Sequence, residues 1–213
     1  AKAGLWIAKK RYAQWIINIE GHTVSKLDVK GLDVVRSSFP PSFRKFMAEI
    51  LEDILNDIDK VDLDQKILDF KEHMKTLPLI DVMFPIGVKN VKKFTVKGAE
   101  PFAPRMKGTP VHVKSALNYN DMLRHHNIKT IRGIINGEKI KWTYLKTNNM
   151  GLDTMAMKGF EDPEPIVKFV QSHINYDKVF KSAFENKLND FYKAMKWGKV
   201  PENNNLGKFF AFG

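Results

Sequence analysis

Two short basic segments hold the residues best suited to bind an anion. One is Lys9-Lys10-Arg11-Tyr12, which lies between apolar runs, and the other ends in Arg36-Ser37-Ser38 just before a proline-started helix. Cations at the centre of an apolar strand are costly unless one face meets water or a polyanion. Hydroxyls and free backbone N–H groups at the start of a helix suit a phosphate. Together the two segments predict a surface that binds a nucleic-acid duplex.

The overall charge agrees with this interpretation, although a simpler one exists. Lysine on an exposed edge strand also prevents unwanted sheet pairing, so the first segment alone could be a solvated strand. Lys and Arg outnumber Asp and Glu by 35 to 24, however, which gives a formal net charge of +11. That balance favours a polyanionic partner, and nucleic acid before membrane.

A second basic cluster lies within and just after a stretch rich in proline and glycine, at 97–110. Such a loop can turn backbone N–H groups outward, which suits contacts with phosphates, but a solvated loop and helix start would look the same. The candidates in this cluster are Arg105, Lys107, His112, Lys114 and Tyr119.

The acidic and histidine residues predict no catalytic or metal site. The aspartate run from Asp57 to Asp64 lacks the glycine and the distal glutamate of a calcium loop, and a helix end followed by an N-cap explains it better. His125 and His126 are adjacent, so they do not face one site on a helix. The chain has no cysteine, which excludes disulfides and thiolate ligands.

The hydrophobic pattern predicts an α+β fold in which helices dominate and the first basic segment lies on a strand. No apolar run approaches the ~20 residues that span a bilayer. The expected elements are strands within 3–30 with a turn at Glu20-Gly21-His22, a helix from Pro40 to about Ile58, a helix capped by Asp62 and ending at Pro78, a strand from Leu79 to Phe84, a loop over 97–110, a helix from Lys114 to His126, a strand from Lys139 to Leu145, and helices from Ile166 to Ile174 and from Val179 to Met195.

The basic segments resemble the end of the palm and the start of the thumb in family B DNA polymerases, in particular those of T-even-like bacteriophages. There, a Lys-Lys-x-Tyr strand and a Lys-Gly-x-Asp-x-Val-Arg segment, here Lys30 to Arg36, hold newly made primer–template. Similar blocks are Phe102 to Lys114, Leu117-Asn118-Tyr119-Asn120 and Gly137-Glu138-Lys139. The resemblance implies palm strands in 1–31, a mainly helical thumb in 32–200 and a flexible tail in 201–213.

The resemblance also implies roles for individual residues. Lys10 and Arg36 would reach the minor groove near the primer end, where base-pair acceptors are similar for every correct pair, so the contact senses geometry rather than sequence. The expected DNA-binding residues are Lys9, Lys10, Arg11, Tyr12, Lys30, Arg36, Ser37, Ser38, Arg105, Lys107, His112, Lys114 and Tyr119.

The catalytic motifs of that family do not occur in this chain. Neither the Tyr-x-Asp-Thr-Asp-Ser hairpin that holds the metal ions nor the Lys-x-x-x-Asn-Ser-x-Tyr-Gly helix that meets the nucleotide is present. The resemblance therefore implies Mg²⁺ bound by carboxylates outside this chain, on a larger polymerase subunit or on the remaining polymerase domains. This chain alone is expected to be inactive and to work in the cytoplasm of an infected bacterial host.

The end of the chain carries three phenylalanines, Phe209, Phe210 and Phe212, after a polar stretch. They could fold back onto their own domain. In the phage polymerases that the chain resembles, such a tail docks on the sliding clamp. Two alternatives remain: a basic accessory protein that binds duplex DNA without joining a polymerase, and an adaptor that mainly recruits the clamp.

Overall fold

The basic segments and the aromatic helices fold into two compact units. The computed structural model describes residues 2–32 and 37–201. Unit 1 comprises Ala1–Leu77 with Phe180–Gly213, and unit 2 comprises Pro78–Val179. Helices and two small antiparallel sheets make up the fold, which confirms the predicted α+β class. In the described part of the chain, no helix is both long and apolar enough to cross a membrane.

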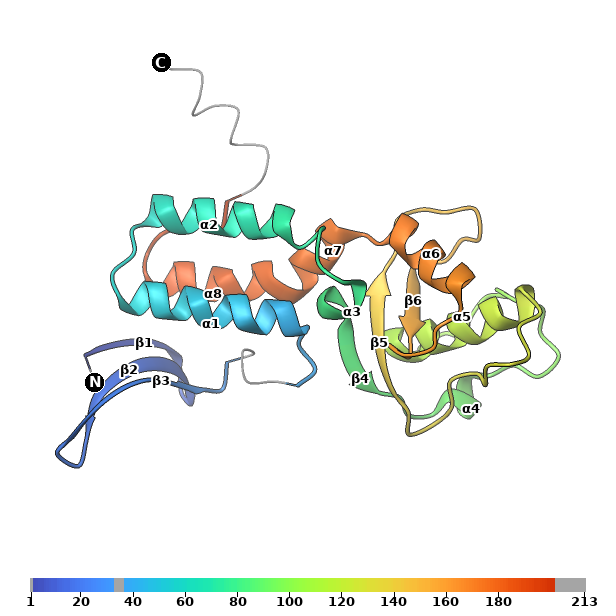
Figure 1. The fold of residues 1–213 in the computed structure, drawn as a ribbon, viewed down its shortest axis with the longest axis horizontal. Coiled ribbons are helices and arrows are strands. Elements are labelled where there is room, and N and C mark those ends of the chain that lie inside the picture. The colour runs from blue at the N-terminus through green and yellow to red at the C-terminus, as the bar shows by residue number, and fades with distance from the viewer. Residues whose placement is uncertain (1, 33–36, 202–213) are drawn as a thin grey trace, which may run out of the picture. The chain divides into compact units, whose positions relative to one another are not determined.

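Unit 1 begins with a three-stranded antiparallel sheet in the order β1-β2-β3 (Figure 1). Its strands are β1 (Ala3–Ala8), β2 (Arg11–Ile19) and β3 (His22–Lys30). Ile19 pairs with His22, so the predicted turn at Glu20-Gly21 is confirmed. Leu5 and Ala13 are buried on the face toward the helices, as the two-residue period of a strand requires.

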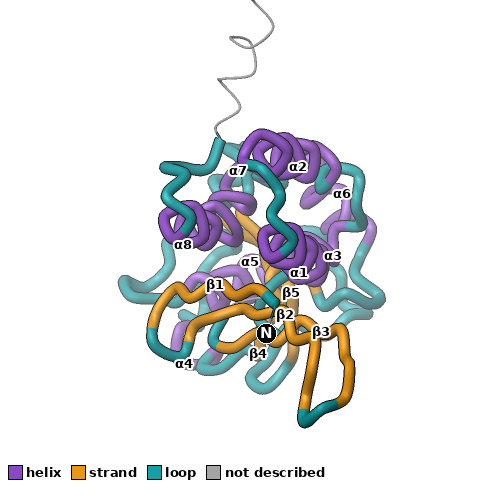
Figure 2. Tube along the Cα trace, turned by 90° about the vertical axis from the view of Figure 1, so that its left-hand side faces the viewer, coloured by secondary structure: helices purple, strands orange, loops and turns teal. Residues whose placement is uncertain are grey.

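The helices of unit 1 form two layers over this sheet, with α1 and α8 between α2 and the strands (Figures 1 and 2). These helices are α1 (Pro41–Leu55), α2 (Lys60–His73) and α8 (Asn186–Ala194), the last preceded by a π-helical turn, η2 (Lys181–Glu185). Their core is aromatic: Phe46 stacks on Phe70 with ring centroids 3.9 Å apart, and Phe184 lies 5.4 Å from Phe46.

The start of α2 differs from its prediction by one turn. Asp59, not Asp62, is the N-cap, and its carboxylate accepts a hydrogen bond from the Asp62 backbone N–H at 2.9 Å. Asp62 instead lies in the first turn, where a negative charge is favourable. The helix ends at His73 rather than at Pro78. The acidic run therefore caps a helix, as the sequence indicated.

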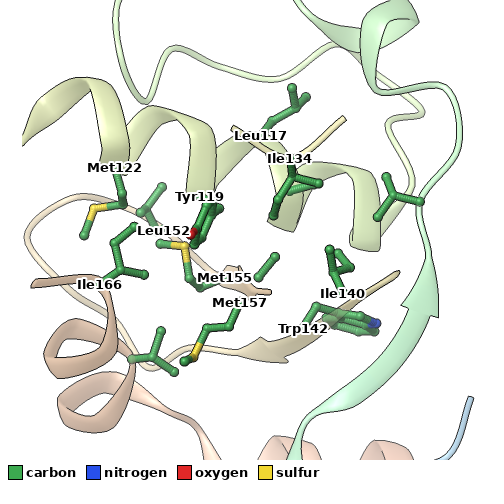
Figure 3. Packing of buried hydrophobic residues seen from close by; sticks show 14 of the residues in the cluster. Leu117, Tyr119, Met122, Ile134, Ile140, Trp142, Leu152, Met155, Met157 and Ile166 are labelled. Carbon is green, nitrogen blue, oxygen red and sulfur yellow. The ribbon is translucent and has the colours of Figure 1, made fainter. Parts of the chain in front are cut away.

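Unit 2 packs its longest helix against a second antiparallel sheet of order β4-β5-β6. Its elements are α3 (Leu79–Val82), β4 (Phe84–Gly87), α4 (Val91–Phe94), α5 (Val111–His125), β5 (Lys139–Tyr144), β6 (Thr154–Met157), α6 (Glu164–His173) and α7 (Tyr176–Phe180). Figure 3 shows the core between α5 and the strands, where Tyr119, Met122, Met155 and Met157 are buried.

Several elements of unit 2 differ from the sequence prediction. Leu79–Val82 is a helical turn rather than a strand, because Pro78 caps it and Asp81 occupies its first turn. The strand begins only at Phe84, opposite Trp142. Strand β6 was not predicted, because its four residues are all buried and show no alternation.

Candidate nucleic-acid interface

Lys9 and Lys10 form the turn between the first two strands. Ala8 pairs with Arg11, so these two lysines make the whole connection, and both side chains are exposed. Lys10 has a φ of 64°, a left-handed conformation common in tight turns between antiparallel strands. The prediction that the whole basic segment lies on a strand is therefore wrong: only Arg11 and Tyr12 are strand residues. The turn keeps two cations in water at one end of the sheet.

Gly31 holds the end of the third strand against this turn. Its φ is +67°, and a Cβ at this position would lie 2.2 Å from the backbone oxygen of Lys10. A contact this close, in this conformation, suits only glycine. The preceding residue, Lys30, pairs with Tyr12 on the middle strand. Three predicted DNA contacts, Lys10, Tyr12 and Lys30, are thus brought together at one end of the sheet.

The second half of the predicted interface is only partly visible. Arg36 lies outside the described residues, so its contact with DNA stays a prediction. Ser37 and Ser38 are exposed in a turn before α1. That helix has Pro40 as its N-cap and Pro41 as its first residue, and proline has no backbone N–H. The helix start therefore offers fewer donors to a phosphate than the sequence analysis assumed.

Arg11 belongs to the opposite face of the sheet from Tyr12. Its Nη2 lies 3.0 Å from Oδ2 of Asp190 on α8, and both side chains are about two-fifths exposed. Side chains alternate along a strand, so Arg11 points toward the helices while Tyr12 points away from them. The ion pair links the start of β2 to the last helix of unit 1. Arg11 therefore has a partner within its own unit.

Arg105, in unit 2, forms an ion pair with a buried carboxylate. Its guanidinium donates to Oδ2 of Asp121 at 2.5 Å and to Oδ1 of Asn118 at 2.7 Å. The Asp121 side chain is only 4% exposed, and Arg124 binds its other oxygen at 2.5 Å. A buried charge must be paired and hydrogen-bonded to be tolerated. Arg105 thus has a structural role within unit 2, and its contact with DNA stays a prediction.

The other cations of the second cluster differ in how available they are. Lys107 is exposed in the loop before α5. Lys114 on α5 forms an ion pair with Asp153 at 2.8 Å, between partly exposed side chains. His112 is half-buried, and burial lowers its pKa from the usual 6.5, so its ring is neutral at pH 7. Of these three, Lys107 fits its predicted role best.

Tyr119 does not lie at a surface. Its side chain is fully buried in the core of unit 2, where Figure 3 shows it between α5 and the sheet. Burial, and then the negative charge of Asp162, raises the pKa of its phenol well above the usual range. The ring contributes to the core and is closed to a duplex. The prediction that Tyr119 contacts DNA is therefore wrong, and its place on the apolar side of α5 is the physical reason.

Acidic and histidine side chains are the candidate metal ligands in the part of the chain that the structure describes. Within residues 2–32 and 37–201, no group of three or more acidic or histidine side chains is arranged to hold a metal ion. His125 and His126 lie side by side with ring centroids 5.0 Å apart. Asp121 and Asp190 form ion pairs with arginines, and Asp59 caps a helix.

Comparison with known proteins gives two matches. The chain is 26% identical over 197 residues to the DNA-directed DNA polymerase of Escherichia phage RB69. This alignment covers 91% of this chain and 21% of the phage protein. It is 36% identical over 70 residues to the catalytic subunit of DNA polymerase alpha from Saccharomyces cerevisiae, or 32% of this chain and 5% of the yeast protein. The chain is similar to DNA-directed DNA polymerases. It spans about a fifth of the phage polymerase, and no protein-family model matches it.

Two residues that hold the basic end of the sheet in place were not assigned that role from the sequence. Asp190 lies 179 positions from its partner Arg11, so no local pattern connects them. Gly31 stood in a quoted motif, but its contact with the Lys10 backbone depends on how β3 ends beside the first turn. Its place after a run of strand residues is the signal that could have indicated a close backbone approach.

Proposed function

We propose that this chain is the part of a DNA-directed DNA polymerase that holds primer–template duplex, with the catalytic carboxylates on another polypeptide or on further polymerase domains. The observation that carries the proposal is the similarity to the phage polymerase over 91% of the chain. The second support is the exposed Lys9–Lys10 turn beside Lys30. The family would be family B, and this segment the end of the palm and the thumb.

The turn suits a duplex for electrostatic reasons. Exposed cations are accessible to a phosphate, and each one that neutralises a phosphate releases a counterion. Lys10 and Lys30 lie at the same end of the sheet, with Tyr12 beside Lys30. In the proposed complex, Lys10 reaches toward the minor groove, and Lys9 and Lys30 bind the backbone. Such contacts position a duplex without selecting its sequence.

Nucleotide addition would require Mg²⁺ held by carboxylates outside this chain. The described residues offer no carboxylate cluster that fits such ions, so the chain's own contribution is to bind and orient the duplex. The partner would be the larger part of a split polymerase or the rest of one polymerase chain, in the cytoplasm of an infected bacterium. An accessory protein that binds duplex DNA without joining a polymerase is the alternative.

A reconstitution experiment tests the proposal. Purified chain is mixed with labelled primer–template, deoxynucleotides and Mg²⁺, with and without the polymerase polypeptide encoded in the same genome that carries the aspartate motif. We expect duplex binding without extension by the chain alone, and extension when both are present. Extension by the chain alone, or no duplex binding, would overturn the proposal. Duplex binding without any rescue of extension would favour the accessory protein.

The C-terminal phenylalanines are proposed to dock on a sliding clamp. Phe209, Phe210 and Phe212 lie outside the described residues, and the proposal rests on the family resemblance. Burial of two or three phenylalanines is worth roughly 3–9 kcal/mol before the tail's ordering is subtracted, and a shared DNA raises the effective concentration. Deletion of 209–213 should shorten the products made in the presence of clamp and leave duplex affinity unchanged. Unchanged product length would contradict clamp docking.

A further inference from the structure

The sheet of unit 1 carries an exposed tryptophan on the face that points away from α1 and α8. This outer face is defined by side chains that alternate with the buried Leu5 and Ala13, and its members are Trp6, Tyr12, Gln14, Ile16, Lys26, Asp28 and Lys30. Trp6 is 64% exposed. A tryptophan left this open in a folded unit is unusual, because burying its large ring is favourable.

The indole of Trp6 rests directly on the backbone of the sheet. A Cβ placed on Gly4 would lie 2.1 Å from Cη2 and 2.5 Å from Cζ3 of this ring. The six-membered ring therefore covers Gly4, and only the lack of a side chain there permits this position. One side of the ring is supported by β1 while the exposed fraction of the ring faces solvent. A supported aromatic ring with a free face is the arrangement on which nucleobases stack.

Cations lie on the same outer face as this ring, on the third strand of the sheet. Trp6 pairs with Tyr12, and Tyr12 pairs with Lys30, so two aromatic side chains and one lysine lie in one row across the sheet. Lys26 lies further along the same face of β3. The carboxylate in the intervening row, Asp28, accepts a hydrogen bond from the Gln14 amide at 3.0 Å. The Lys9–Lys10 turn continues the positive charge beyond this row.

We propose that Trp6 is a stacking platform for an unpaired nucleobase, and that the lysines on the same face of β3 bind the phosphates of single-stranded nucleic acid. The inference rests on the proposed function and adds a single-strand site to the proposed duplex-binding site. Such a single-strand site would suit an unpaired primer or template end. The cores of protein–protein interfaces are depleted of charged residues, whereas Lys26 and Lys30 lie on this face. A nucleic acid therefore fits it better than a protein partner does.

Two kinds of DNA separate this site from the duplex site. Binding of a fluorescently labelled single-stranded oligodeoxynucleotide and of a blunt duplex is measured by anisotropy, with circular dichroism as the check on folding. Trp6→Ala should weaken single-strand binding about tenfold, because base–aromatic stacking is lost, and should change duplex binding less than twofold. Trp6→Phe should keep most of the single-strand affinity.

Gly4→Ala is the sharpest variant, because it keeps the indole and every charge but displaces the ring from the backbone. It should weaken single-strand binding without affecting the duplex. A second readout is the tryptophan fluorescence of the wild type, which the oligonucleotide should quench more strongly than that of Trp6→Phe.

The outcomes distinguish this inference from the proposed function. If single-strand binding is unchanged in Trp6→Ala, or falls only in step with duplex binding, the platform does not exist, although the duplex proposal survives. If Trp6→Ala instead no longer binds the polypeptide that carries the aspartate motif, while its oligonucleotide binding is unchanged, the outer face is a protein interface and the inference is wrong. If the wild type binds neither DNA, both proposals fail.

Discussion

The two basic regions contain the same residue types and use them in opposite ways. At the tip of the unit 1 sheet, Lys9 and Lys10 are exposed, and within the described residues neither forms an ion pair. In unit 2, Arg105 is held by Asp121 and Lys114 by Asp153. The comparison teaches that a basic motif indicates available charge only where no carboxylate of the same fold meets it.

The cause of the difference is the depth at which each region lies. A hairpin turn projects into water, where a lysine needs no partner. The carboxylate of Asp121, by contrast, is buried on α5 and requires two guanidinium groups and the Phe102 backbone N–H to be stable there. Arg105 and Arg124 therefore hold the fold of unit 2 together. In the proposed complex, contact of unit 2 with DNA would fall to exposed residues such as Lys107.

The largest effect is expected from the removal of Asp121. Asp121→Ala leaves the largely buried Arg105 without its counter-ion, which should lower the free energy of unfolding by about 3–5 kcal/mol. Asp153→Ala is the matched control, since it breaks an exposed ion pair worth about 0–1 kcal/mol. Denaturant unfolding of both variants measures the difference. An equal loss of unfolding free energy in the two variants would show that the ion pair between Arg105 and Asp121 does not stabilise the fold more than an exposed pair does.

A smaller effect is expected at Gly31, where the end of β3 lies against the turn between β1 and β2. Gly31→Ala forces a Cβ against the Lys10 backbone at a φ of +67°, which should destabilise the protein by about 1–3 kcal/mol and weaken duplex binding. Gly21→Ala is the control, because Gly21 also has a positive φ but no atom within 4 Å of the added Cβ. Identical behaviour of the two variants in unfolding and binding assays would argue that Gly31 does not hold the Lys9–Lys10 turn in place.

A modest effect is expected at the ion pair between Arg11 and Asp190. Both side chains are about two-fifths exposed, so Asp190→Asn should cost about 1 kcal/mol or less in stability. If Arg11 serves mainly to hold β2 against α8, the variant should leave the salt dependence of duplex binding unchanged. A steeper dependence would mean that the freed guanidinium joins the interface.

The smallest effect concerns pH. Burial lowers the pKa of His112 in the folded state below 6.5, so the unfolded chain binds a proton more readily than the folded one. Stability should therefore be complete above the unfolded pKa and fall as pH drops through it toward the folded pKa. His112→Gln should flatten this part of the profile, as thermal unfolding between pH 5 and 7 would show (about the range where histidine titrates). An unchanged profile would assign the pH dependence to another group.

Much of the fold could be predicted from local patterns. The apolar stripe behind Pro41 predicted α1, and the turn residues at Glu20-Gly21 predicted the hairpin between β2 and β3. Prediction failed where contacts with residues distant in the sequence determine the secondary structure. Thr154–Met157 is a strand only because it pairs with β5 in a buried core, and its methionines and alanine carry little strand preference of their own.

The candidate site was less predictable than the fold for the same reason. Residue types identified Lys9, Lys10 and Lys30 as candidates, and the structure brings them to one end of a sheet. No pattern in the sequence distinguished them from Arg105, whose partner lies 16 positions away, or from Tyr119, which occupies the core. Availability depends on long-range contacts, and a linear motif does not encode them.

The salt dependence of duplex binding tests the central claim most directly. The affinity for a short primer–template is measured over a range of salt concentrations for the wild type, for Lys9→Ala/Lys10→Ala, and for the control Lys45→Ala/Lys75→Ala, which removes the same charge from exposed positions on and near the helices. If the turn binds two phosphates, the slope of log affinity against log salt should become shallower by about 1.8 in the turn variant and stay unchanged in the control. Equal slopes in all three proteins would contradict the account.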